Sequence, residues 1–124
     1  MTRTLIAASA AGALAFAAPA LAHPKLLSST PAANATVSKP ASVTLNFSEP
    51  LVAPMSGIEL TMTGMPGMAG HSPMKVAGFK TAVTGKTMVA TLPRPLPAGT
   101  YALKWHTVGG DTHRIEGNFG FTVK

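Results

Sequence analysis

Four methionines and one histidine recur at three-residue intervals in the middle of the chain. They are Met62, Met65, Met68, His71 and Met74, with glycines and prolines between them. These glycines and prolines exclude a helix interior or a central strand. An extended backbone with three residues per turn would bring every third side chain to one edge. Because thioether sulfur is a soft, neutral ligand that suits Cu(I) better than zinc, calcium or magnesium, the stretch predicts a Cu(I) site.

Methionine also fills gaps in hydrophobic cores, which gives the stretch a second interpretation. A core segment would show helix or strand periodicity, and residues 62–74 show neither. Four of the seven methionines of the chain nevertheless lie here. Met62 keeps a structural alternative, because residues 57–63 alternate like a strand and Met62 would be its last inward residue. A flexible loop with accidental methionines also stays open.

The first 22 residues have the pattern of a secretory signal peptide. Arg3 supplies a positive start, residues 5–17 are apolar and rich in alanine, and Ala20-Leu21-Ala22 is a small-residue cleavage signal. The apolar run is short for a membrane span, and no later run approaches that length. We expect cleavage after Ala22, a domain of residues 23–124, and a bacterial periplasmic location. An uncleaved N-terminal anchor is the alternative.

Cleavage would make His23 the first residue and give the chain a second set of metal ligands. A free α-amine has a pKa of roughly 7.7–8.0 and can chelate a metal together with the ring Nδ1. Pro24 has no amide N–H, so the backbone cannot extend that chelate. In extended chain Asp111 and His113 would share a face. This set of nitrogen and oxygen donors favours Cu(II), with Glu49 as an outer ligand or acceptor.

Two other interpretations concern the same region. Asp111-Thr112-His113 follows a glycine pair and could be an ordinary turn. His106 has the parity of the residues opposite the core face, so we interpret it as a surface residue rather than a ligand.

Composition bounds the class of protein. The ten Lys and Arg residues, one of them Arg3, outnumber four Asp and Glu residues, but they are scattered singly with few aromatics between them. Nucleic-acid binding is therefore poorly supported, whereas an acidic protein or an anionic membrane surface stays possible. No cysteine is present, so the domain must be stabilised by its core alone.

Short alternating segments predict an all-β domain. The expected strands are the segments 23–31, 42–48, 57–63, 79–83, 87–92, 100–108 and 117–124, and Thr84-Gly85-Lys86 reads as a hairpin turn. With no helical window, these seven strands predict an antiparallel Greek-key barrel or sandwich.

The mature sequence resembles the CopC/PcoC family of small periplasmic copper-resistance proteins along essentially its whole length. The matching motifs are His-Pro-Lys-Leu at 23–26, Ser-Ser-Thr-Pro at 28–31, Phe-Ser-Glu at 47–49, the stretch 62–74, Leu-Pro-Ala-Gly-Thr-Tyr at 96–101, Trp105, Asp-Thr-His at 111–113 and Gly-x-Phe-x-Phe-x-Val at 117–123. The segment from Met68 to His71 is one residue longer than the usual form, so the methionines are better ligand candidates than His71.

The resemblance implies a cupredoxin-like or immunoglobulin-like β-domain without enzymatic turnover. It implies Cu(II) ligands at His23, Asp111 and His113 with Glu49 nearby, and Cu(I) ligands among the methionines and His71. The expected function is that of a copper carrier for resistance or homeostasis. It would pass copper to a periplasmic or inner-membrane protein, as a monomer or a weak copper-bridged dimer.

Two other functions are weighed against a carrier. An N-terminal histidine clamp also occurs in copper polysaccharide monooxygenases, but those enzymes need a flat aromatic surface, and this chain has one Trp and one Tyr. A metal-free adhesion or scaffold module explains the strands and leaves both ligand clusters as coincidence.

Overall fold

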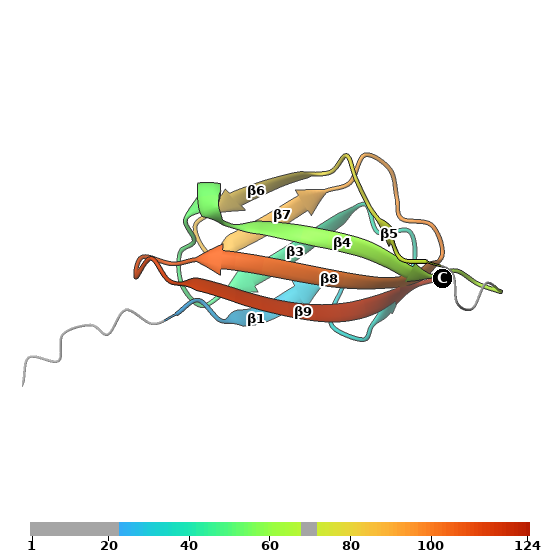
Figure 1. Ribbon diagram of the computed structural model, residues 1–124, viewed down its shortest axis with the longest axis horizontal. Helices are drawn as coiled ribbons and strands as arrows, with labels where there is room; N and C mark the ends of the chain where they lie inside the picture. Colours follow the sequence, from blue (N-terminus) through green and yellow to red (C-terminus); the bar gives the residue numbers. More distant parts are fainter. Residues whose placement is uncertain (1–22, 68–71) are drawn as a thin grey trace, which may run out of the picture.

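Two β-sheets packed face to face form the domain, as the computed structural model shows for residues 23–67 and 72–124 (Figure 1). The strands are β1 (Leu26–Thr30), β2 (Thr36–Val37), β3 (Ser42–Phe47), β4 (Gly57–Gly64), β5 (Met74–Lys75), β6 (Lys80–Thr84), β7 (Thr87–Thr91), β8 (Gly99–Val108) and β9 (Arg114–Val123). One turn of 3-10 helix, η1 (Ala53–Met55), precedes β4. Within the described ranges no helix is long and apolar enough to span a membrane. The leader expected at residues 1–22 lies outside them.

The chain crosses repeatedly between the two sheets, as in Greek-key sandwiches. One sheet has the order β1-β3-β7-β6 and the other the order β2-β9-β8-β4-β5. The expected all-β sandwich is thus confirmed, and the sheets do not close into a barrel. Pairing is antiparallel except between β2 and β9, which are parallel.

The alternation in the sequence places the core between the sheets, because successive strand residues point to opposite faces. The fifteen residues of the hydrophobic core cluster are at most 8% exposed, and they include the predicted inward positions of β3, β4 and β8: Val43, Leu45, Phe47, Ile58, Leu60, Met62, Tyr101, Leu103 and Trp105. The Phe47 and Trp105 rings meet edge to face at 5.1 Å. Phe121 and Val123 are buried as expected, whereas Phe119 is only half-buried.

All seven expected strands are present, and two further strands of two residues each were not expected. These are β2 and β5, which are too short to show a period. Strand β9 also begins at Arg114 rather than Gly117, because Arg114, Ile115 and Glu116 pair with the end of β8. Asp111 and His113 therefore lie in the connection between two long strands.

Local turn chemistry fixes the strand ends. Gly85 adopts a positive φ of 59° in the hairpin between β6 and β7, which a glycine tolerates at no steric cost. At the start of β8 the Tyr101 hydroxyl donates to the Pro97 carbonyl over 2.6 Å, the arrangement called a tyrosine corner in sandwich domains.

Candidate metal centres

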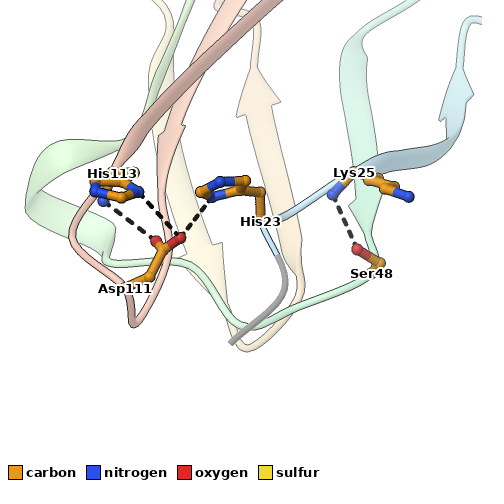
Figure 2. A network of polar contacts seen from close by, with 5 residues as sticks. All are labelled: His23, Lys25, Ser48, Asp111 and His113. Carbon is orange, nitrogen blue, oxygen red and sulfur yellow. Dashed lines mark hydrogen bonds and ion pairs between the residues drawn. The ribbon is translucent and has the colours of Figure 1, made fainter. Parts of the chain in front are cut away.

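Three side chains, one from the segment before β1 and two from the connection between β8 and β9, converge at one end of the sandwich (Figure 2). One ligand atom from each of His23, Asp111 and His113 lies within 4.8 Å of the others. The His23 Nδ1 is 2.5 Å from the Asp111 Oδ2, and the His113 Nδ1 is 3.6 Å from the same oxygen. The two imidazole rings are 5.3 Å apart. The ligand set expected from the sequence is thus brought together, and among the described residues it is the one group of three or more such side chains.

The position of His23 depends on how the next two residues are fixed to the sandwich. The Lys25 amide donates to the Ser48 Oγ over 2.9 Å, and the Ser48 amide donates to the Lys25 carbonyl over 2.9 Å. Pro24 is fully buried against Gly109, where a Cβ would lie 2.8 Å from the proline Cδ. A side chain at Gly109 would therefore displace Pro24, and His23 with it.

Asp111 and His113 converge through a turn rather than through extended chain. The Thr112 amide donates to the Gly109 carbonyl over 3.0 Å, and Thr112 itself has a positive φ of 62°. The Asp111 Oδ1 accepts from the His113 amide over 3.2 Å, which ties the carboxylate to the imidazole that follows it. The expectation of a strand-like Asp-x-His is therefore wrong, and the turn brings the same two side chains together.

The three side chains form an open group in which the carboxylate of Asp111 is the most buried. The Asp111 side chain is 11% exposed, whereas those of His23 and His113 are 51% and 71% exposed. Two ligand atoms on opposite sides of one ion lie about 4 Å apart when each bond is near 2 Å. The observed spacing therefore fits a single ion after small side-chain movements. Two imidazoles and a carboxylate are a donor set that suits Cu(II), and also Zn²⁺, Ni²⁺ or Fe(II).

Glu49 and His106 lie near this end of the sandwich without joining the group. Glu49 is half-buried and directly follows Ser48, so it starts from the edge where the N-terminal segment is held. His106 is half-buried on the outer face of β8, where its ring lies over Gly57. The surface interpretation of His106 agrees with this position.

The methionine stretch lies at the opposite end of the sandwich (Figure 1). Its two ends are strand, because Met62 in β4 pairs with Met74 in β5. Met62 is 5% exposed and belongs to the core cluster, while Met65 and Met74 are 38% and 52% exposed. Met68 and His71 lie outside the described residues. The uniform polyproline-like edge expected from the sequence is therefore wrong at both ends of the stretch.

Sequence reasoning missed three supporting residues. Pro24 is buried, Gly109 packs against it without a side chain, and Ser48 forms hydrogen bonds with Lys25. The sequence indicates only that Pro24 lacks an N–H and that a glycine pair precedes Asp111. A proline beside a ligand together with a glycine in a distant loop is the signal that could have suggested a close approach.

Comparisons with known proteins agree with this architecture. A family model described as a CopC domain matches residues 26–124. The chain is 52% identical over 106 residues to copper resistance protein C of Escherichia coli, covering 85% of this chain and 84% of that protein. It is 48% identical over 124 residues to copper resistance protein C of Xanthomonas campestris pv. juglandis, covering 99% and 93% of the two chains. The crystal structure of PcoC, a methionine-rich copper resistance protein from Escherichia coli, superimposes with a TM-score of 0.75 at 50% identity. It covers 83% of this chain and 100% of that one. These matches span both sheets.

Proposed function

This chain belongs to the CopC domain family, and from that membership we propose that it is a periplasmic copper carrier. It would hold Cu(II) at His23, Asp111 and His113 and Cu(I) at the methionine stretch, and would pass copper to another protein without catalysing a reaction. The observation that carries the proposal is the convergence of the three nitrogen and oxygen ligands within 4.8 Å. Copper resistance is the property named for the relatives in Escherichia coli and Xanthomonas.

Cu(II) binding would use side chains that already lie close together, since the His23 Nδ1 is 2.5 Å from the Asp111 Oδ2. Imidazole and carboxylate groups bind a metal ion in their deprotonated forms, so Cu(II) binding should weaken as the pH falls. After removal of residues 1–22 the α-amine of His23 would add a further nitrogen, and Glu49 could accept hydrogen bonds from the ligands.

Cu(I) binding would use the exposed thioethers at the other end. Met65 and Met74 are open to solvent, and Met62 contributes a sulfur at the wall of the core. Met68 and His71 complete the proposed set. Because these ligands are neutral and soft, reduction of copper favours this end and oxidation favours the imidazole end.

Release of the ion to a partner is supported by the exposure of both sites. Imidazoles that are 51% and 71% exposed can be replaced one at a time by ligands from another protein. The same holds for the exposed methionines. An enclosed site would instead require local unfolding before the ion could leave.

Copper titration of the mature protein, residues 23–124, tests the proposal. We expect one Cu(II) per chain by electron paramagnetic resonance in air, and one Cu(I) in competition with a chromophoric chelator without oxygen. Asp111→Asn should weaken Cu(II) binding by at least about 10- to 100-fold, the range for losing an outer-shell partner of a metal ligand, because Asp111 is proposed as a direct ligand. Glu116→Gln is the matched control, because Glu116 is exposed, forms an ion pair with Arg114 and lies outside the group of His23, Asp111 and His113. Equal Cu(II) affinity in the two variants would refute the assigned site.

A further inference from the structure

A largely apolar pocket of about 720 Å³ lies beside the two ends of the methionine stretch. Its walls come from β4, β5, the segment after β5, the connection before β8, and β8 itself. Among the lining residues are Met62, Met74, Lys75, Ala77, Arg94 and Tyr101. This volume lies in the range of pockets that bind small molecules or single side chains of a partner.

Backbone hydrogen bonds hold one wall of this pocket and leave few free polar groups there. Along the connection before β8, the Leu92 and Leu96 amides donate to the Ala41 and Pro40 carbonyls, at 3.0 and 3.1 Å. Prolines in the same wall have no N–H to satisfy. The Tyr101 hydroxyl is already bonded to the Pro97 carbonyl. The pocket is therefore suited to an apolar group.

Two cations and no acidic residue belong to the lining. Arg94 is exposed, and the Lys75 side chain is 80% exposed. Lys75 lies 3.7 Å from Glu59, whose side chain is 59% exposed, and such a solvent-exposed pair contributes little. Both cations thus remain available to pair with carboxylates of an incoming molecule. An acidic segment that carries an apolar side chain complements both the pocket and its charges.

Met62 and Met74 belong both to the pocket lining and to the proposed Cu(I) ligands. A molecule seated in the pocket would therefore lie against the sulfur ligands from which copper must be transferred. We propose that this pocket is the docking site for the protein that exchanges copper with the methionine stretch. An apolar side chain of an acidic segment would enter the pocket, and neighbouring carboxylates would pair with Lys75 and Arg94. The inference rests on the proposed carrier function and names the chemistry of its partner.

Binding of a synthetic peptide to copper-free mature protein tests the docking site. The probe is a fluorescein-labelled peptide in which a Leu-Met pair is flanked on each side by two glutamates, in buffer with a copper chelator. We expect saturable binding, with amide shifts at Val76, Leu92 and Tyr101 by nuclear magnetic resonance, and weaker binding at high salt. Peptides with glutamine for glutamate, or serine for the Leu-Met pair, should bind much more weakly.

Matched variants separate docking from copper binding. Lys75→Glu with Arg94→Glu should weaken the peptide about tenfold, because both partner charges are reversed. Lys86→Glu with Lys124→Glu makes the same change in net charge at two exposed lysines outside the pocket. This control should bind like the wild type. Ala77→Trp, on the exposed part of the lining, should block the pocket while the thermal unfolding transition is retained.

The outcomes distinguish this proposal from the carrier function. Both pocket variants should keep the Cu(I) and Cu(II) stoichiometries of the wild type. If the wild type bound no copper, the carrier function would be refuted, while peptide binding would still test the docking site. Absence of peptide binding, or equal loss in both double variants, would overturn the docking site. Binding of decanoate or anionic phospholipid vesicles in place of the peptide would also overturn it, and would indicate a site for an anionic lipid.

Discussion

The two ends of this sandwich use opposite ways of assembling a ligand cluster. At the imidazole end, His23 comes from the segment before β1 and Asp111 and His113 from the connection between β8 and β9, so the fold creates the candidate site. At the methionine end, the candidate ligands lie within residues 62–74, and the fold only closes that stretch through the pairing of β4 with β5. The first site should therefore be sensitive to packing, and the second to local sequence.

The largest expected effect comes from a single added residue, which should weaken copper binding at one end of the sandwich and not at the other. An alanine placed before His23 removes the α-amine from the ligand set and should weaken Cu(II) binding by at least about 100-fold, more than most losses of outer-shell support. Cu(I) affinity and the unfolding midpoint should not change. Mass spectrometry confirms the terminus, and an alanine added after Lys124 is the control. Unchanged Cu(II) affinity would show that the amine does not ligate.

A pair of neighbouring glycines gives the next test. Gly109→Ala places a Cβ 2.8 Å from the Pro24 Cδ and 3.5 Å from the Asp111 Oδ1. Such overpacking should destabilise the fold by about 1–3 kcal/mol and weaken Cu(II) binding, with Cu(I) binding retained. Gly110→Ala is a close control, because no atom lies within 4 Å of its Cβ. Urea unfolding measures the change in stability, and copper titration measures the change in affinity. Equal results for the two variants would contradict the claim that the packing of Pro24 on Gly109 positions His23.

Methionine replacements should show the reverse pattern at the other end. Met65→Leu with Met74→Leu removes two exposed thioethers, so we expect a clear loss of Cu(I) affinity with little change in stability. Met88→Leu is the control, since Met88 is fully buried and its replacement should cost less than about 1.5 kcal/mol without affecting Cu(I). If Met88→Leu weakened Cu(I) as much as the double variant, the assignment of the site to residues 62–74 would fail.

The smallest expected effect concerns Tyr101, which lies at the methionine end. Tyr101→Phe removes the hydrogen bond to Pro97 and should lower the free energy of unfolding by about 1 kcal/mol at pH 8. Burial raises the pKa of the Tyr101 hydroxyl above its ordinary value of 10.0. The unfolded chain then loses this proton at lower pH than the folded chain, so the advantage of the wild type shrinks as the pH rises past 10. Urea unfolding at pH 8 and 10.5 should show this; an advantage that grows with pH would contradict it.

Most of the fold could be predicted because inward and outward residues alternate along the long strands with a period of two. Val43, Leu45 and Phe47, for example, are all inward, and the pattern alone predicts them. Strand β5 could not be found in this way, because its two residues pair with β4 only after the methionine stretch turns back. Met62 is buried because it is an inward residue of β4, with Ile58 and Leu60, whereas Met65 and Met74 are exposed.

The candidate site was predictable as a set of residue types and not as a geometry. His23, Asp111 and His113 could be chosen from their chemistry, but the positive φ of Thr112 is a tertiary feature that no local preference indicates, since β-branched residues avoid that region. The packing of Pro24 on Gly109 joins residues far apart in the chain, so it becomes visible only when the two sheets are assembled.

Amide spectra of residues 23–124 during one redox cycle test the central claim. This claim is that the protein binds copper at two separate sites, one for each oxidation state. After one equivalent of Cu(II) in air, paramagnetic broadening should be confined to residues near His23, Ser48 and the connection from Gly109 to His113. After anaerobic reduction with ascorbate, those signals should return, and shifts should appear at Met65, Met74 and Tyr101. Broadening around the methionines with Cu(II), or copper that stays at the imidazole end after reduction, would contradict the account.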